Sequence, residues 1–379
     1  MKNSIASFAM KRTLFILFTS ILIVAPAAHH AQEVSKRVEP TPDDFATFFA
    51  GQRFRGPSPL SSIANSPAGL AHAAQINELN EEWETTRLSK IRKWAATDVH
   101  PKIKRPAVVK YMFGGPDFVH ATTVFPGAPE YILVGMEPLG ALPDFFTMEL
   151  PEIQNYLTHL NHTLRSISVR NFFITKEMRE DFGKSGVEGV YPVLLYFAAL
   201  TGHEVLNANF VKLNPDGEPV VAIQKDALGI WLQLRELKPT PGAPATQNLY
   251  YFRTDLSNAG FKKDTPFHKF LTARPGGAGY LKAASFLMHT DSFSNIRNFL
   301  VGDCSYILQD ASGIPADFFA QYYNVSYWGN YIGPIEMFSE YDQPYLHQAY
   351  RSGVAKPLPF GTGYRMKDDN SVQMLGVRK

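Results

Sequence analysis

The pattern of apolar and polar positions predicts a strand–helix–strand unit between Pro106 and Gly140. Ala107–Phe113 is short, apolar and β-branched at its centre, which is typical of a buried strand. Two glycines and a proline end it, and Phe118–Phe125 then has the pattern of a short helix that ends at a Pro-Gly pair. Tyr131–Met136 is a second apolar strand. Two strands joined by a helix predict a right-handed parallel βαβ unit.

Further helices and a third strand follow this unit. Pro151–Ile167 is the clearest helix, because its apolar residues fall within one arc of a helical wheel. Val169–Ile174 is predicted to be a strand, and Tyr191–Leu200 a buried helix that ends at Gly202. The alternation of strands and helices predicts a parallel α/β core.

The pattern then changes to strands separated by turn residues. Glu204–Leu213, Gly229–Leu237 and Asn248–Asp255 predict an antiparallel β-meander over about 204–255. The remaining predicted elements are helices at about 265–273, 280–289 and 292–301, and a strand at Ser305–Gln309. We therefore expect a Rossmann-like α/β fold: a mixed sheet with a parallel βαβ core, flanking helices and a β-meander insertion.

The N-terminal part of the mature chain is predicted to be helical. Ser66-Pro67 is a helix start, and the pattern that follows runs to about Ala96. We expect residues 32–105 to form this helical segment, as a small subdomain or as a cover on the main sheet. Residues 106–379 are then the α/β main domain.

Residues 1–31 have the pattern of a signal peptide. Lys11 and Arg12 precede the apolar run Thr13–Val24, and small residues follow, with cleavage expected after Ala27 or Ala31. The run is shorter than the roughly 20 residues that a membrane span needs, so we expect a mature protein without a span, periplasmic or secreted.

Charge and cysteine content exclude several classes. The chain has a net charge of +2, and loss of residues 1–31 removes three basic residues and no acid, which makes it −1. Nucleic acid is therefore an unexpected partner. Cys304 is the only cysteine, which excludes an intramolecular disulfide and a cysteine zinc site. We expect no cofactor, because nicotinamide and methyl-donor cofactors are not generally supplied outside the cytoplasm.

Three acids are candidates for catalysis because they follow predicted strands. Asp117 comes after the first strand, Glu137 ends the second, and Asp310 ends the strand at 305–309. Ligands of open parallel sheets bind beyond the carboxyl ends of the strands, where these carboxylates would serve acid–base work or cation binding. The alternative is that acids end strands because they suit turns.

The Gly114-Gly115-Pro116-Asp117 turn is a weak candidate for phosphate binding. It lacks the G-x-G-x-x-G spacing of dinucleotide sites. Asp117 would also lie in the first helical turn, where its charge repels an anion. A tight turn and a helix start explain this sequence better.

Two polar sets have spacings that share a helix face. Lys282, Ser285 and His289 would lie on one side of a helix, as a nucleophile with a base would. His159 and His162 have a spacing that can hold a metal, but they fall away from the apolar arc of their helix. We interpret the first set as a polar stripe on an otherwise packed helix and the two histidines as solvated, and we predict no metal site.

The segment 322–350 is rich in tyrosine and contains a tryptophan. Tyr327, Trp328 and Tyr331 are the candidate substrate-binding residues, because exposed rings with a polar tip suit sugar stacking or a protein interface. Packing within the core is the alternative.

Short stretches spread over about two thirds of the chain carry a resemblance. They are Gly115-Pro116-Asp117, VGMEP at Val134–Pro138, the run Leu281–Leu287, Ile296-Arg297, QDASGIP at Gln309–Pro315 and PFGTGY at Pro359–Tyr364. In these stretches the chain resembles a set of exported bacterial proteins of uncharacterised function. The resemblance implies one compact unit and no particular chemistry.

Three functions remain as hypotheses, the third being a structural component with no small ligand. The first is a cofactor-independent hydrolase with a carboxylate site at the carboxyl ends of the strands, formed by Asp117, Glu137 and Asp310. The second is a non-catalytic cell-envelope protein that binds glycan or protein through residues 322–350. A small molecule or a glycan is the expected ligand, and the sequence leaves the oligomeric state open.

Overall fold

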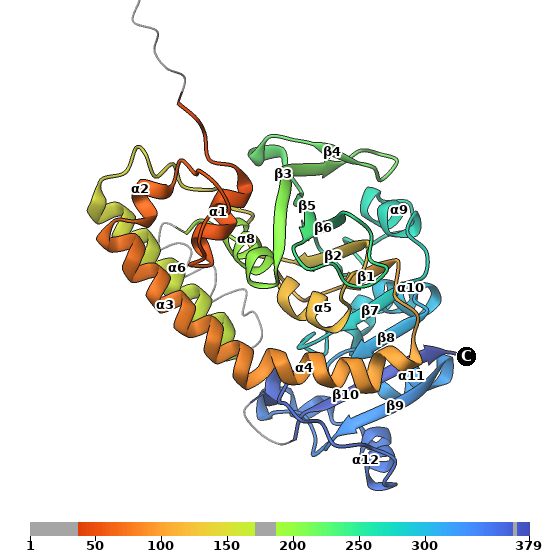
Figure 1. The fold of residues 1–379 in the computed structure, drawn as a ribbon. Coiled ribbons are helices and arrows are strands. Elements are labelled where there is room, and N and C mark those ends of the chain that lie inside the picture. The colour runs from red at the N-terminus through yellow and green to blue at the C-terminus, as the bar shows by residue number, and fades with distance from the viewer. Residues whose placement is uncertain (1–36, 171–186, 367–369) are drawn as a thin grey trace, which may run out of the picture. The chain divides into compact units, whose positions relative to one another are not determined.

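A ten-stranded mixed sheet, in the order β4-β3-β5-β6-β2-β1-β7-β8-β10-β9, runs through the protein (Figure 1). The five strands from β6 to β8 are parallel to one another, and antiparallel strands flank them on both sides. The strands are β1 (Val108–Tyr111), β2 (Glu130–Gly135), β3 (His203–Leu213), β4 (Pro219–Val221), β5 (Gly229–Glu236), β6 (Gln247–Arg253), β7 (Ala278–Leu281), β8 (Tyr306–Gln309), β9 (Tyr323–Gly329) and β10 (Val372–Arg378). The expected α/β fold with a mixed sheet is confirmed.

The structure is a computed structural model that describes residues 37–170, 187–366 and 370–379. Residues Glu39–Lys379 form one compact unit. The predicted signal peptide, residues 1–31, lies outside the described residues. Among those described, no helix is both long and apolar enough to cross a membrane.

The strand order places a topological switch point between β1 and β7. Along the chain, β2 and β6 are added on one side of β1, and β7 and β8 on the other. Connections leave the sheet in opposite directions at such a point, which opens a crevice at the carboxyl ends of the two strands. The fold thus favours a site at the ends of β1 and β7.

The predicted βαβ unit is confirmed as β1, α5 (Phe118–Val124) and β2, with β1 parallel to β2. Asp117 is the N-cap of α5, and its side chain accepts a hydrogen bond from the backbone N–H of His120. A capping carboxylate satisfies a free N–H and stabilises the helix dipole. The helix start therefore fixes the position of Asp117.

Helices cover both faces of the sheet. They are α1 (Pro42–Phe49), α2 (Ser61–Ala64), α3 (Pro67–Trp83), α4 (Ser89–Trp94), α5, α6 (Leu150–Arg170), α8 (Tyr191–Leu200), α9 (Pro266–Thr272), α10 (Ser294–Asp303), α11 (Ala316–Tyr322) and α12 (Pro344–Arg351). π-Helical turns η1 (Glu84–Leu88) and η2 (Ala95–Val99) continue α3 and α4. Short 3₁₀ turns are η3 (His100–Lys102), η4 (Gln224–Asp226), η5 (Leu287–His289), η6 (Asp291–Phe293), η7 (Glu336–Tyr341) and η8 (Gly363–Arg365).

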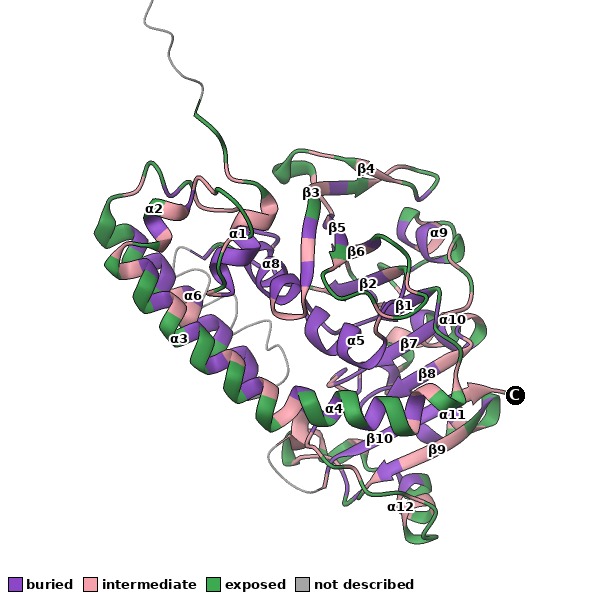
Figure 2. Ribbon diagram, viewed as in Figure 1, coloured by how far each residue is buried: buried purple, intermediate pink, exposed green. Residues whose placement is uncertain are grey.

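Alternate residues of the central strands face two separate cores. Val109 and Tyr111 of β1 belong to the core under α1, α3, α4 and α8, whereas Val108 belongs to the core under α9, α10 and α11. Figure 2 shows buried and exposed positions alternating along α3 and α4, while α5 is buried throughout. The N-terminal helices share their core with the sheet, as a cover on one of its faces.

Some predicted elements differ from the structure. The helix predicted at about 280–289 is wrong, because the segment contains the end of β7 and a turn. Ala278–Leu281 has no β-branched residue, so the sequence did not indicate the strand that β1 and β8 pair with. The strand predicted at 169–174 does not begin at Val169, since α6 continues to Arg170 and residues 171–174 lie outside the described part.

Lys110 allows a first test of the sheet. It is fully buried in β1, and its Nζ donates to Arg274 O (2.6 Å), to Gly276 O (3.0 Å) and to the Asp303 carboxylate. We predict that Lys110→Met lowers the free energy of unfolding in urea by about 3 kcal/mol, because it leaves these acceptors without their donor. Lys356→Met, in an exposed ion pair, is the control and should change little. Equal effects would contradict the structural role of Lys110.

Candidate functional site

The three predicted acids all lie beyond the carboxyl ends of parallel strands, on the same side of the sheet. Asp117 follows β1, Glu137 follows β2 and Asp310 follows β8, and all three are buried, at 1%, 2% and 6% exposure. Water does not solvate these carboxyl groups, so each needs hydrogen-bond donors from the protein. The three carboxyl groups have different donors, and they therefore differ in the chemistry that they can perform.

Asp117 is the centre of a buried charged cluster that spans the switch point. Its Oδ2 accepts from Tyr111 Oη (2.7 Å) and from Lys282 Nζ (2.7 Å), and its Oδ1 accepts from His120 Nδ1 (2.7 Å). Lys282 comes directly after β7, and its side chain is 1% exposed. We define Tyr111, Asp117, His120 and Lys282 as the switch-point cluster.

The cluster keeps Asp117 ionised. Burial alone would raise the pKa of this carboxyl, but hydrogen bonds from His120 and Lys282, and the positive charge that both carry at acid pH, outweigh burial and hold the pKa well below its usual range. Burial lowers the pKa of Lys282, against the opposing effect of Asp117. A carboxylate held in this state is a counter-ion and a poor proton donor.

His120 is neutral at physiological pH. Burial lowers its pKa to about 4, although Asp117 opposes the shift. Since Asp117 is ionised, the 2.7 Å contact requires the proton to be on Nδ1 of His120. The opposite nitrogen, Nε2, therefore carries a lone pair.

Asp310 has the opposite tendency. Burial raises its pKa, although hydrogen bonds from Ser312 and Ala283 and the charge of Lys282 oppose the shift. Its Oδ1 accepts from the Ser312 N–H (2.9 Å) and hydroxyl, and its Oδ2 accepts from Ala283 N–H (2.8 Å). The charge of Lys282 acts on both Asp117 and Asp310. Two carboxyls near one lysine thus have pKa values shifted in opposite directions.

Glu137 occupies a separate position at the end of β2. Its Oε2 accepts from Tyr251 Oη (3.0 Å) and from the Met136 N–H (3.0 Å). A Cβ on Gly135 would meet this oxygen at 2.2 Å and the Cα of Gly115 at 2.8 Å, so the carboxylate lies beside the glycine turn after β1. Glu137 is thus near the turn that leads to Asp117, and the hydrogen bonds described connect it to β6 through Tyr251.

The loop after Lys282 has an unusual backbone. Ala283, Ser285 and Phe286 all have positive φ, at 52°, 54° and 54°. Non-glycine residues in this conformation are strained, and they concentrate at functional sites. The strain persists because the loop is tied to its surroundings: Ala284 N–H donates to Ser312 Oγ (2.7 Å) and Tyr364 Oη donates to Ala283 O (3.0 Å).

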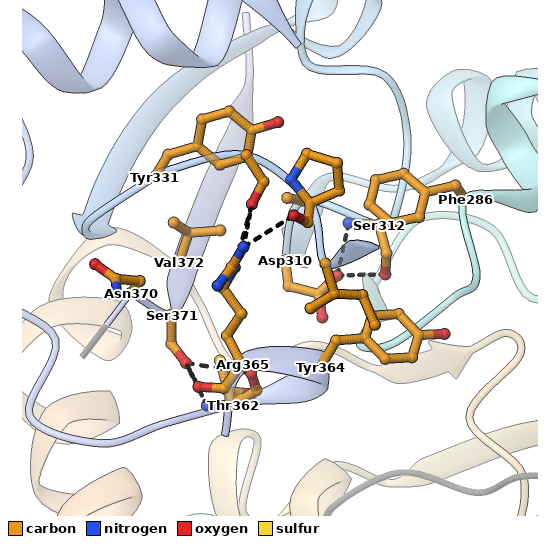
Figure 3. Close-up of a pocket in the computed structure, with 14 residues that line it drawn as sticks. Phe286, Asp310, Ser312, Tyr331, Thr362, Tyr364, Arg365, Asn370, Ser371 and Val372 are labelled. Carbon is orange, nitrogen blue, oxygen red and sulfur yellow. Dashed lines mark hydrogen bonds between the residues drawn. The ribbon is translucent and has the colours of Figure 1, made fainter. Parts of the chain in front are cut away.

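A pocket lies beside this loop, at the carboxyl end of β8 (Figure 3). Aromatic rings of Phe286, Tyr331 and Tyr364 line it together with Asp310 and Ser312, and Arg365 crosses it to donate to the carbonyls of Gly333 and Pro334. A Cβ on Gly363 would meet Asp310 Oδ2 at 2.3 Å, so only glycine allows the chain to pass so close to this carboxyl. We name this the β8 pocket.

The structure divides the predicted aromatic residues. Tyr331 lines the β8 pocket with Asp310. Trp328 is fully buried, where its Nε1 donates to Asp98 (3.0 Å), and Tyr327 is half-buried against Tyr350. One predicted ring and one predicted acid therefore meet in a pocket.

Three members of the switch-point cluster, Tyr111, His120 and Lys282, were not predicted from the sequence to belong to a site with Asp117. Lys282 was assigned to a helix face with Ser285 and His289, a face that does not exist because the segment is not helical. A lysine directly after four apolar or small residues was the available signal for a buried charge. For His120, the signal was its position three residues after Asp117 at a helix start, where N-cap and N3 side chains meet.

The other polar candidates do not form sites. His162 on α6 is exposed and His159 is half-buried, with its Nδ1 2.9 Å from Asn155 O. In the part of the chain that the structure describes, no group of three or more His, Cys, Asp or Glu residues is placed to hold a metal ion. Cys304 is buried, and burial raises its pKa to about 12, which makes it a weak nucleophile.

Comparison of the chain with protein-family models, with curated proteins and with solved structures finds no match.

The buried histidines predict how stability depends on pH. An unfolded histidine binds a proton near pH 6.5, whereas His120 in the folded protein does so only near pH 4. Below pH 6.5 the unfolded state takes up this proton first. His120 thus contributes stability that is complete above about pH 6.5 and is lost towards pH 4, by about 3 kcal/mol in total. His289, with a pKa also lowered by burial to about 4, adds to the trend.

The measurement is urea unfolding between pH 7 and pH 4. We expect the slope of the unfolding free energy against pH to decrease by up to one proton in His120→Gln, because glutamine does not titrate. His162→Gln, at an exposed position, is the control and should keep the wild-type slope. A wild-type slope in His120→Gln would show that His120 is not held neutral in the folded state.

Proposed function

We propose that this protein is an exported, cofactor-independent hydrolase whose site lies at the carboxyl ends of β1, β7 and β8. The location outside the cytoplasm is supported by the pattern of residues 1–31. The position of the site is supported by the switch point between β1 and β7, where ligands of doubly wound sheets bind.

The observation that carries the proposal is the opposite shift of two carboxyl pKa values around one lysine. Asp117 is held ionised and Asp310 is shifted towards its protonated form, with Lys282 acting on both. Enzymes assign acid and base roles to chemically identical residues through such differences in environment. Of the three predicted acids, Asp310 is the one that lines the β8 pocket.

Each group then has a role in hydrolysis. A protonated Asp310 donates its proton to the leaving group as the bond between this group and the electrophilic atom breaks, and water adds to that atom. The Asp310 carboxylate then takes up the proton that the added water releases, which restores the acid. Lys282 supplies positive charge against the negative charge that develops on the substrate, and Asp117 holds this lysine in place. The strained loop 283–286 positions the backbone that bonds to Asp310 and Ser312. Glu137 lies farther along the same edge, with its described hydrogen bonds from Tyr251 and Met136.

The lining of the β8 pocket indicates the kind of substrate. Phe286, Tyr331 and Tyr364 provide ring surfaces, and Asp310, Ser312 and Arg365 provide polar groups among them. Aromatic walls with a few polar groups, around a space of about 40 Å³, suit one end of a small polar molecule, such as the hydroxyl-bearing edge of a sugar unit.

The second candidate function is a non-catalytic envelope protein that binds glycan or protein through residues 322–350. It is supported by Tyr331 in the β8 pocket and by the exposed side chains of Tyr322 (42%) and Tyr345 (39%) in the same segment. This candidate needs no proton donor, which separates it from hydrolysis in an experiment.

The test uses purified protein and chromogenic p-nitrophenyl acetate, phosphate, β-glucoside and β-N-acetylglucosaminide. We expect turnover of at least one of these probes. Asp310→Asn should lower kcat for it by about 100-fold or more, the usual contribution of a general acid. Asp255→Asn is the matched control, since Asp255 is an exposed acid just after β6 at the same edge, and should retain kcat.

Absence of turnover for all four probes, or an unchanged kcat in Asp310→Asn, would contradict the hydrolase. A thermal shift with glucose or N-acetylglucosamine that Tyr331→Ala abolishes and Asp310→Asn retains would support the binding protein instead.

A further inference from the structure

Two buried ring nitrogens with complementary hydrogen-bonding capacity belong to neighbouring rings beside the switch-point cluster. They are His120 Nε2 and Trp83 Nε1, and neither has a hydrogen-bond partner among the described residues. The two side chains are buried, at 2% and 3% exposure, and their ring centroids are 6.0 Å apart with a tilt of 58°. Buried polar atoms in native proteins are almost always bonded, so this pair requires an explanation.

The nitrogen of His120 is an acceptor. Its Nδ1 carries the proton, because it lies 2.7 Å from an oxygen of the ionised Asp117. Lys282 Nζ is 3.3 Å from the same Nδ1 and donates instead to Asp117 Oδ2 at 2.7 Å. The lone pair of His120 Nε2 therefore lies inside the protein without a donor among the described residues.

The nitrogen of Trp83 is a donor only, since an indole N–H cannot accept. Trp83 is the last residue of α3, and the π-helical turn η1 begins directly after it. π-Helical turns inside helices are frequent at functional sites, because they change the direction of the side chains around them. The turn also carries Arg87, whose charge acts on both His120 and Lys282.

We propose that a single hydroxyl group binds between His120 Nε2 and Trp83 Nε1. A hydroxyl donates its proton to the histidine lone pair and accepts the indole N–H, which satisfies both atoms at once. The hydroxyl belongs to a water molecule or to a ligand. This site lies apart from the residues that line the β8 pocket, and it does not depend on hydrolysis there.

The chemistry of the site follows from its neighbours. Asp117 fixes the histidine tautomer through Nδ1, which directs the lone pair of Nε2 at the hydroxyl proton. A hydroxyl in this position is hydrogen-bonded to a neutral base that an ionised carboxylate supports. The switch-point cluster therefore binds a proton-donating group, in addition to joining the segments that follow β1 and β7.

The experiment is NMR of the purified protein labelled with ¹⁵N histidine. The wild type should show His120 as the Nδ1–H tautomer, with the Nε2 resonance displaced from that of an unbonded lone pair. Trp83→Phe keeps an aromatic ring and removes the indole N–H, and it should move this resonance. Trp94→Phe is the matched control, because Trp94 Nε1 is also buried without a partner among the described residues but its ring contacts are with Trp328 and Phe360. It should leave the His120 resonance in place.

A second measurement on the wild type identifies the source of the hydroxyl and does not depend on a variant that folds. A nuclear Overhauser effect from the Trp83 indole proton to the water resonance supports bound water. An effect to non-exchangeable protons of a small molecule, which mass spectrometry then detects in the denatured protein, supports a ligand hydroxyl. An Nε2–H tautomer, an unchanged resonance in Trp83→Phe, or an indole proton with neither effect would overturn the proposal. Each of these outcomes is independent of turnover in the hydrolase assay.

Discussion

The buried ion pair between Asp117 and Lys282 is the interaction on which the arrangement of the site depends. Asp117 caps the helix that follows β1, and Lys282 comes directly after β7, so the pair joins the two sides of the switch point. Burying either charge alone would cost several kcal/mol, so the pair is stable only because each group is the partner of the other and Tyr111 and His120 complete the hydrogen bonds of Asp117. The fold supplies this geometry through the N-cap of α5 and the end of β7.

The same pair organises the neighbouring loop and pocket. Lys282 directly precedes the strained segment 283–286, whose backbone N–H groups donate to the side chains of Asp310 and Ser312 after β8. Asp310 in turn lies against Gly363 and lines the β8 pocket. A line of charged and polar groups thus runs from the end of β1 across β7 to β8. At one end Asp117 is an ionised carboxylate, and at the other the pKa of Asp310 is raised towards its neutral form. Asp310 is therefore the acid of the proposed hydrolase.

The sequence predicted the local elements well and the non-local pairings poorly. The unit from β1 to β2 and the position of Asp117 at a helix start follow from apolar runs, glycines and prolines, which act locally. β7 was missed because Ala278–Leu281 has weak strand propensity and becomes a strand only through pairing with β1 and β8. Lys282 was missed for a related reason, since Asp117, the partner that justifies burying it, comes from a segment distant in sequence. His120 has its partner Asp117 only three residues before it, so its burial had a local signal. The strands β9 and β10 likewise pair across more than forty residues, and no local pattern in the sequence predicted them.

A double-mutant cycle on Asp117 and Lys282 tests the central claim most directly. Asp117→Asn and Lys282→Met are measured singly and together by urea unfolding at pH 7. We predict that each single change lowers the free energy of unfolding by about 3–5 kcal/mol, because it leaves the other group buried without its partner. The double variant should lose less than the sum of the two, with a coupling of about 2 kcal/mol. Losses that add to within about 0.5 kcal/mol would contradict the account, since the two charges would then not depend on each other.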